Sequence, residues 1–395
     1  MHHRTRLLVL VLTTPLVLFT VVGGLLGQQA TPPGAYPQLR VFDDVVSLIF
    51  SNYVEEPEAD PVLDGALRGL SDALDPDSSF LSQEHVRQVE AGKAARPGGT
   101  GLSVTRQYYL RVVAAREGSP AAAAGLQTGD YIRAINGKST RHLTLFEGEQ
   151  LLRGPVGSTV TLTVLRGSAT DTHEVPLTFT PDVVPPPSSR MVADAVGLVR
   201  VAAITPETPT QVRAQVGALE RQGARALIVD LRHTAEGDPA HGVALARLFV
   251  ESGTLAIKES RGGIQEKVDA TAGSADAILR LPITLLATNG TSQAAEVFAA
   301  ALVDNDRATL IGERTLGRAA AQKLVKLPDG SGLWLTHQRW LTPKGTAIHG
   351  TGLTPAVAVA EPDVEFGAPR PTTDPILDKA LEHVAAPPRA AAPAA

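Results

Sequence analysis

Residues 289–322 read NGTSQAAEVFAAALVDNDRATLIGERTLGRAAAQ and determine the fold expected for the C-terminal half of the chain. The alanine-rich apolar run predicts a buried helix over residues 292–303, and a short strand rich in apolar residues follows at 308–311. The alternation extends upstream, with strands expected at 196–201, 224–231 and 281–287 and helices at 209–222 and 241–252. Alternating strands and helices indicate an α/β layered structure.

The same stretch resembles the signature of the carboxyl-terminal processing (tail-specific) serine peptidases. In that family a Ser-Ala-Ser-Ala-Ser-Glu run opens a helix and its middle serine is the nucleophile, while the lysine of a following Phe-Gly-Lys is the general base. Glu296 sets the register, which places Gln293 at the nucleophile position and Arg318 at the base position. Gln322 matches the glutamine that follows the lysine by four residues.

Both substitutions remove the chemistry that the resemblance implies. A Ser-Lys dyad needs a hydroxyl that can attack and an amine that can be neutral near pH 7. A glutamine amide is not such a nucleophile, and an arginine keeps its proton at any working pH. The sequence therefore predicts a member of a serine endopeptidase family in which Gln293 and Arg318 are degenerate and the enzyme is inactive.

A glycine loop near the expected site also departs from the family pattern. The strand ending in Asp-Leu-Arg232 leads to His233-Thr-Ala-Glu-Gly237, where the family has Asn-Asn-Pro-Gly-Gly and uses backbone N–H groups for the oxyanion hole. Only Gly237 is retained. A carboxylate at Glu236 is expected to repel a developing oxyanion.

Residues 98–180 resemble a PDZ domain through the runs Gly118-Ser-Pro-Ala121 and Gly129-Asp-Tyr-Ile-Arg-Ala-Ile-Asn-Gly137. The loop Gly99-Thr100-Gly101-Leu102 matches the one that receives a peptide C-terminal carboxylate through N–H groups. The expected peptide-binding residues are Gly99, Thr100, Gly101, Leu102 and Val104. With Leu145 and Leu152 they suggest an apolar ligand terminus; the other interpretation is a PDZ fold used only as a spacer.

The N-terminus begins with a short basic head and a nearly uninterrupted apolar run over residues 7–26. This pattern predicts a secretory signal peptide or a membrane anchor, with an uncleaved anchor favoured because no clear cleavage site follows. Further on, residues 74–81 resemble the family's Leu-Asp-Pro-His-Ser-x-Tyr-Leu motif, with Asp77 in place of histidine. We interpret that string as a structural helix stop.

The predicted fold class is multidomain α+β: a helical N-terminal region, a PDZ domain (a β-sandwich with helices), and an α/β peptidase core resembling the tail-specific protease (ClpP/crotonase-like) fold. The expected boundaries are 1–27 for the signal peptide or anchor, 38–95 for the helical region, 98–180 for the PDZ domain, 190–365 for the core, and 366–395 for a C-terminal helix and disordered tail.

Composition removes several classes of function. The chain of 395 residues has no cysteine and a formal net charge of −5, so thiolate chemistry is excluded and nothing suggests binding to nucleic acid. No histidine cluster or phosphate-binding glycine loop stands out, so no metal and no cofactor are expected.

The sequence supports a cell-envelope, extracytoplasmic (periplasmic) pseudopeptidase that binds protein or peptide C-termini and acts as a scaffold or regulator. Its expected partners also include an active peptidase relative or a second copy of the chain. The alternative is an active serine endopeptidase that cleaves near protein C-termini with other groups. Ser292 would then be the nucleophile, with His233 as base and Glu236 orienting it.

Overall fold

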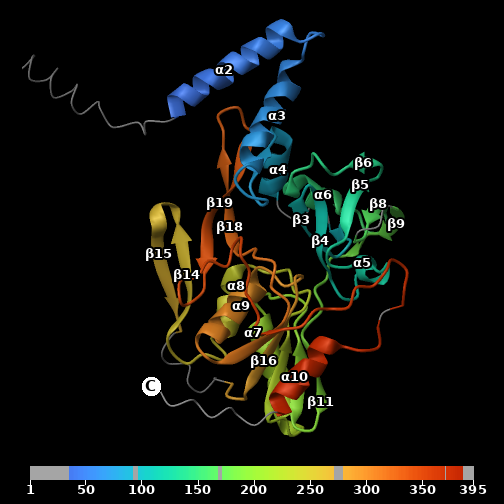
Figure 1. Ribbon diagram of the computed structural model, residues 1–395, viewed down its shortest axis with the longest axis vertical. Helices are drawn as coiled ribbons and strands as arrows, with labels where there is room; N and C mark the ends of the chain where they lie inside the picture. Colours follow the sequence, from blue (N-terminus) through green and yellow to red (C-terminus); the bar gives the residue numbers. More distant parts are fainter. Residues whose placement is uncertain (1–34, 92–96, 168–170, 271–278, 370, 386–395) are drawn as a thin grey trace, which may run out of the picture. The chain divides into compact units, whose positions relative to one another are not determined.

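A computed structural model describes residues 35–91, 97–167, 171–270, 279–369 and 371–385 (Figure 1). The described residues up to Ala66 form one compact unit, and those from Leu67 onward form a second. The predicted signal peptide or anchor and the predicted disordered tail after residue 385 lie outside the described residues. No helix within the described ranges is both long and apolar enough to cross a membrane.

The first unit contains helix α2, Ala35–Asn52, and the first half of α3, Ala59–Asp72. Both belong to the region that was expected to be helical, although α2 begins at Ala35, before the expected start at residue 38. Large apolar side chains remain exposed on α2, among them Leu39, Val45, Leu48 and Phe50.

The Asp-Pro-Asp string is more than the predicted helix stop. The Asp75 carboxylate accepts hydrogen bonds from the amides of Asp77 and Ser78 at 2.9 and 2.7 Å. Strand β1, Ser79–Leu81, follows and pairs antiparallel with β19, Gly332–Leu341. Helix α4, Gln83–Ala91, comes next. The motif therefore leads the chain into a sheet of the core. The sequence had predicted that it belongs to a separate helical region.

The PDZ domain consists of a larger and a smaller sheet with two short helices. The larger sheet has the order β3-β4-β5-β8-β9, with β6 on β5, and the smaller has the order β10-β2-β7. Their bounds are β2 Gly98–Gly99, β3 Leu102–Gln107, β4 Tyr109–Ala115, β5 Tyr131–Ile135, β6 Lys138–Ser139, β7 Arg153–Gly154, β8 Thr159–Leu165, β9 His173–Thr178, β10 Thr180–Pro181, α5 Pro120–Ala123 and α6 Leu145–Leu151. Strand β3 lies at the edge of its sheet, beside α6.

The α/β core is built on a sheet of order β11-β12-β13-β16-β17-β20, parallel except for β11. The strands are β11 Ser188–Ala193, β12 Val196–Arg200, β13 Ala226–Asp230, β16 Ile283–Ala287, β17 Ala308–Gly312 and β20 Val357–Ala358. The helices are α7 Thr208–Arg221, α8 Pro239–Ala246, α9 Ala294–Asp304 and α10 Pro375–Ala385. This arrangement confirms the predicted α/β alternation.

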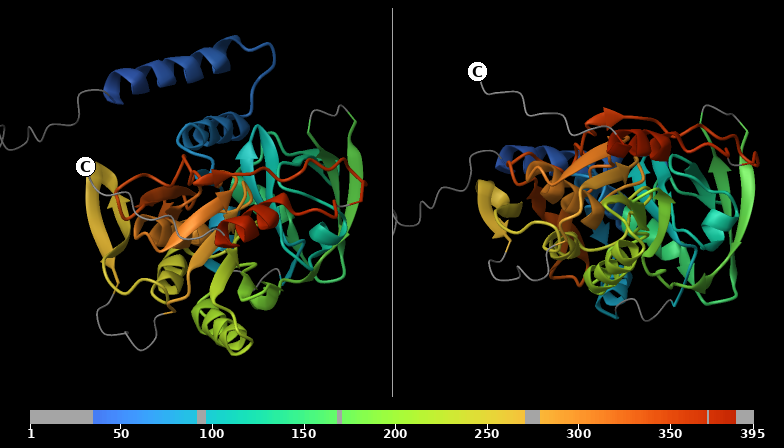
Figure 2. Two further views of the ribbon diagram at one scale, coloured as in Figure 1. Left: turned by 60° about the horizontal axis from the view of Figure 1, so that its bottom comes forward. Right: turned by 90° about the horizontal axis from the view of Figure 1, so that it is seen from below.

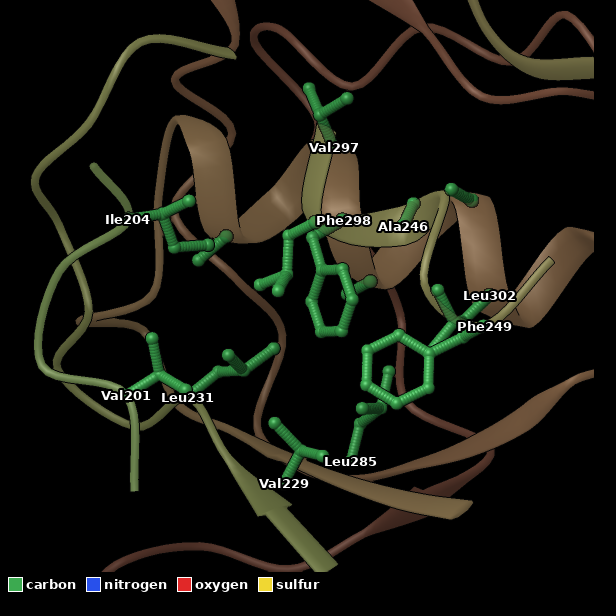
Figure 3. Packing of buried hydrophobic residues seen from close by; sticks show 14 of the residues in the cluster. Val201, Ile204, Val229, Leu231, Ala246, Phe249, Leu285, Val297, Phe298 and Leu302 are labelled. Carbon is green, nitrogen blue, oxygen red and sulfur yellow. The ribbon is translucent and has the colours of Figure 1, made fainter. Parts of the chain in front are cut away.

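The two faces of this sheet are covered by different helices. Side chains on one face of the sheet, such as Val229 and Leu285, pack with α7, α8 and α9. Figure 3 shows Phe249 and Phe298 between the helices and the sheet. Side chains on the other face, including Ile228, pack with α10. Figure 2 shows α10 and α7 on opposite sides of the sheet. Helix α9 is thus held inside the core, with its N-terminus at the ends of the strands.

A second, antiparallel sheet was not expected in this form. It has the order β1-β19-β14-β15, with β18 also paired to β19. Its further strands are β14 Thr254–Ser260, β15 Ile264–Asp269 and β18 Ala320–Lys326. Strand β15 is polar and mostly exposed and has no apolar alternation, so its residues carry no pattern from which a strand could be predicted.

Candidate functional site

The nucleophile position lies in a strained turn where the chain passes from β16 into α9. Gln293 is the residue before the helix and has φ 56° and ψ −120°, a conformation that costs a non-glycine residue free energy. Its backbone N–H donates to the Arg318 carbonyl at 3.1 Å. A sharp strand-to-helix turn of this kind presents a nucleophile in other hydrolases, and here it presents a glutamine.

The base position lies beside it, as the sequence predicted, but its side chain has other partners. Arg318 Nε lies 2.6 Å from Asp77 Oδ1, Nη1 donates to the Val104 carbonyl at 3.1 Å, and Nη2 lies 3.6 Å from Glu149 Oε1. Burial opposes the charge, but the Asp77 and Glu149 carboxylates outweigh it and raise the pKa of Arg318 above its usual value. This guanidinium is an anchored cation and cannot accept a proton.

Glu296, which served only to set the register in the sequence, holds the two positions together. The fully buried carboxylate accepts hydrogen bonds from the Thr315 hydroxyl and from the amides of Gly317 at 2.6 Å, Arg318 at 2.8 Å and Gln293 at 3.2 Å. Burial raises the pKa of Glu296 to about 7, against the lowering effect of these donors. The sequence offered one signal for this role, a carboxylate three residues into an otherwise apolar helix.

The glycine loop brings Gly237 against the start of α9. Gly237 has φ 128°, and a Cβ there would come within 2.2 Å of the Ile204 carbonyl oxygen and 3.1 Å of the Ala294 Cβ. Gly237 therefore lies against the residue that follows the nucleophile position. Within the described ranges, neither the Gly237 N–H nor the Ala294 N–H has a hydrogen-bond partner.

Glu236 does not act as the sequence suggested. Its carboxylate accepts from Arg116 Nη1 at 3.0 and 2.8 Å, and Arg116 Nη2 donates to Asp182 at 2.5 Å. The expected repulsion of an oxyanion was argued for an unpaired charge, whereas this carboxylate is neutralised by an arginine that is only 8% exposed. Glu236 is an interdomain ion-pair partner that joins the core loop to the PDZ domain.

The alternative catalytic set is not assembled. Ser292 Oγ is buried and has no hydrogen-bond partner among the described residues. His233 Nδ1 lies 3.0 Å from the Thr128 hydroxyl and Nε2 lies 3.1 Å from Glu361. Glu236 is committed to Arg116, so it does not orient His233. Nor does Ser292 cap the helix, since Gln293 occupies that position.

Gln322 lies on β18 and belongs to a polar network of the antiparallel sheet. Its Nε2 donates to Thr336 Oγ1 at 3.2 Å, and that hydroxyl lies 3.3 Å from Asp75 Oδ1. The residue therefore links β18 and β19 to the motif before β1.

The backbone N–H groups of the PDZ loop differ in whether they already have a partner. The Thr100 amide donates to the Leu152 carbonyl at 3.3 Å, so it is already used. The Gly101 N–H has no partner within the described residues, and the Leu102 N–H makes only a 3.4 Å contact with Thr100 Oγ1. Gly101 has φ 75°, and a Cβ there would lie 2.1 Å from Ser119 Cβ. The loop geometry therefore requires glycine.

The apolar side chains assigned to the peptide groove are part of the PDZ core. Val104, Leu145 and Leu152 are buried in one cluster, against which Leu102 packs. Val104 can therefore contribute its backbone to a ligand but not its side chain. Gly99 lies in β2, paired with β7 and β10. Within the described ranges no group of three histidine or acidic residues could hold a metal ion.

Comparison with known proteins agrees with this architecture. A sequence profile of peptidase family S41 matches residues 195–359, and a PDZ profile matches residues 111–166. The carboxy-terminal-processing protease of Bartonella bacilliformis is 30% identical over 335 residues, 83% of this chain and 76% of that protein. The chain belongs to peptidase family S41.

Two further proteins agree with the assignment. The carboxy-terminal processing protease CtpA of Bacillus subtilis is 29% identical over 363 residues, 90% of this chain and 76% of that protein. Among solved structures, a photosystem II D1 C-terminal processing protease is similar with a TM-score of 0.69 and 27% identity, covering 79% of this chain and 85% of that chain. The predicted resemblance to the carboxyl-terminal processing peptidases and the predicted fold class are confirmed.

Proposed function

We propose that this S41 protein does not cleave peptide bonds and instead binds protein C-termini through its PDZ domain, as a scaffold or regulator. The observation that carries the proposal is the pair Gln293 and Arg318. They lie side by side through the hydrogen bond between the Gln293 amide and the Arg318 carbonyl, and neither side chain can perform the step that its position requires.

The contacts of Arg318 argue against a general base at this position. Its guanidinium is held by a nearly buried carboxylate, Asp77, and by the Val104 carbonyl. A group used to shuttle protons needs a pKa near the working pH, and these contacts move that of Arg318 in the opposite direction.

The binding role rests on the backbone of the PDZ domain. The N–H of Gly101 has no partner among the described residues, and that of Leu102 makes a long hydrogen bond of 3.4 Å to Thr100 Oγ1. Both are donors for a carboxylate, and the edge strand β3 offers a ladder for an added peptide strand. These groups do not depend on side-chain identity.

The proposed location rests on the N-terminal sequence. The apolar run at residues 7–26 supports a signal peptide or membrane anchor, which would put the PDZ and core domains outside the cytoplasm in the cell envelope. We propose free protein C-termini as ligands there, with an active S41 protease or a second copy of the chain as further partners.

The second candidate is an active endopeptidase, which is favoured by one observation: the relatives reported above carry the names of proteases. The unpaired N–H groups of Gly237 and Ala294 are compatible with it. It requires a nucleophile, and Ser292 has no base within hydrogen-bonding distance among the described residues.

The binding proposal is tested with protein lacking residues 1–27 and a fluorescein-labelled decapeptide ending in Ala-Leu-Val, in acid and amide forms. The acid is expected to bind with micromolar affinity and the amide about tenfold more weakly, because amidation removes a charge-assisted set of hydrogen bonds. Fluorescence anisotropy measures both. Equal binding of the two forms, or binding of neither, would leave the PDZ domain as a spacer.

A further inference from the structure

Two positions at which this chain departs from the family pattern contact each other. Asp77 stands where the family motif has histidine, and Arg318 stands where it has lysine. Their side chains form an ion pair with Nε and Oδ1 2.6 Å apart, and Asp77 is only 5% exposed. A buried carboxylate of this kind requires a fixed cation, which arginine supplies at every pH. The pair therefore fixes the direction of the rest of the Arg318 guanidinium.

That direction leads into the PDZ groove. We use the term PDZ groove for the place beside the edge strand β3 and helix α6 where a PDZ domain receives an added peptide strand; β3 and α6 pack beside each other. The Arg318 guanidinium meets both walls, because Nη1 donates to the Val104 carbonyl on β3 and Nη2 lies 3.6 Å from Glu149 on α6. A side chain of the core domain thus spans the groove of the PDZ domain.

The Val104 carbonyl is one that an added peptide strand would use. Residues two apart on a strand present their backbone groups to the same edge, so Val104 follows Leu102 along the free edge of β3. A ligand whose C-terminal carboxylate binds at Gly101 and Leu102 would bring the backbone N–H of one of its preceding residues to the Val104 carbonyl. An added strand also lies about 4.8 Å from β3, and the guanidinium, 3.1 Å from that carbonyl, occupies this space.

We infer that Arg318 is an intramolecular plug of the PDZ groove, and that a C-terminal peptide and the Arg318–Val104 contact exclude each other. Ligand binding then requires the guanidinium to leave β3. Because the Arg318 carbonyl accepts a hydrogen bond from the Gln293 backbone N–H, binding of a peptide in the groove is coupled to the conformation of the loop that carries Arg318. The side chain at the family's base position, Arg318, therefore competes with the ligand for the edge of β3. This inference rests on the proposed function, because it concerns the same groove.

The test compares peptide affinity in three forms of the protein lacking residues 1–27. Arg318→Gln combined with Asp77→Asn removes both charges together, so no buried carboxylate is left unpaired. Arg318→Lys keeps a charge for Asp77 but lacks the fork that reaches Val104 at the same time. The control is Arg314→Gln, which removes an exposed positive charge four residues earlier, whereas the double variant and Arg318→Lys leave the net charge unchanged.

The probe is the labelled decapeptide ending in Ala-Leu-Val with a free carboxylate. The double variant is expected to bind it about tenfold more tightly than the wild type, Arg318→Lys to fall between them, and Arg314→Gln to stay within about twofold. Thermal unfolding of each protein identifies a variant that has lost its fold, in which case Arg318→Lys carries the comparison.

Two different results would overturn the inference and are distinguishable. If wild type, double variant and Arg318→Lys bind the free acid equally well, and better than the amide, peptide binding stands and the plug is wrong. If none of them distinguishes acid from amide, the binding function itself fails, and the plug fails with it.

Discussion

The start of α9 and the loop Gly99-Thr100-Gly101-Leu102 of the PDZ domain are the two sites on which the proposed function rests, and they differ in which groups would supply the chemistry. At α9 the backbone frame persists: Gln293 keeps a strained turn and Gly237 keeps its close approach to Ala294. The reacting side chains are gone. In the PDZ loop the functional groups are backbone N–H groups, and Gly101 preserves the turn that exposes them. A site made of backbone tolerates side-chain change, whereas a dyad does not.

The largest expected effect comes from restoring the dyad. Gln293→Ser with Arg318→Lys is expected to stay near background, because the Asp77 carboxylate would hold the new lysine in its charged form. Adding Asp77→Asn frees the amine, and casein cleavage should rise about 100-fold above the double variant. Release of labelled casein fragments measures it.

The control for this restoration is Glu236→Gly in place of Asp77→Asn. Since Glu236 is already neutralised by Arg116, its removal should add less than threefold, about 0.6 kcal/mol. A larger gain from Glu236→Gly than from Asp77→Asn would show that the loop containing Glu236, rather than the ion pair with Asp77, limits the cleavage rate of the restored dyad.

A smaller effect is expected on the PDZ side, where glycine geometry carries the function. Gly101→Ala places a Cβ against Ser119 and should weaken binding of the free-acid decapeptide at least tenfold. Gly118→Ala is the matched control, because Gly118 has almost the same φ, 76°, but open space around its Cβ. It should cost only about 1 kcal/mol of stability and leave binding within twofold. Equal losses in both variants would mean that backbone strain alone decides the result.

A different kind of effect is expected in the pH dependence of stability, through Glu296. Its folded pKa of about 7 lies above the ordinary value for a glutamate, so the folded state binds the proton more tightly than the unfolded state. The stability from this group is fully present below about pH 4.5 and is lost as the pH rises through 7. Urea unfolding should show the wild type losing up to about 3 kcal/mol relative to Glu296→Gln between pH 4.5 and 8.

The exposed Glu220 on α7 provides the control for that experiment. Glu220→Gln should follow the wild type at every pH. If the difference between wild type and Glu296→Gln is flat with pH, the four donors around the carboxylate keep it ionised throughout.

The sequence predicted the parts that depend on local pattern. The apolar run of α9, the alternation of the core and the PDZ turns follow from periodicity and glycine placement, and the register through Glu296 placed Gln293 beside Arg318. The contacts of long polar side chains were not predictable. Glu236 meets Arg116 from 120 residues away, and Arg318 meets Val104 from 214 residues away.

The strand β1 shows the same limit. Residues 79–81 give a helix-stop signal locally, and they become a strand because β19, some 250 residues later, supplies a partner. The sequence also assigned Val104 to the peptide groove on strand position alone, whereas its side chain is inside the PDZ core.

The most direct test of the central claim follows binding and cleavage of one peptide in one sample. The decapeptide ending in Ala-Leu-Val and unfolded casein are incubated with protein lacking residues 1–27, and intact mass is followed over a day alongside anisotropy. We predict a peptide that is bound and remains whole, with casein also intact. Cleavage above background that disappears in Ser292→Ala would contradict the account and establish an active endopeptidase.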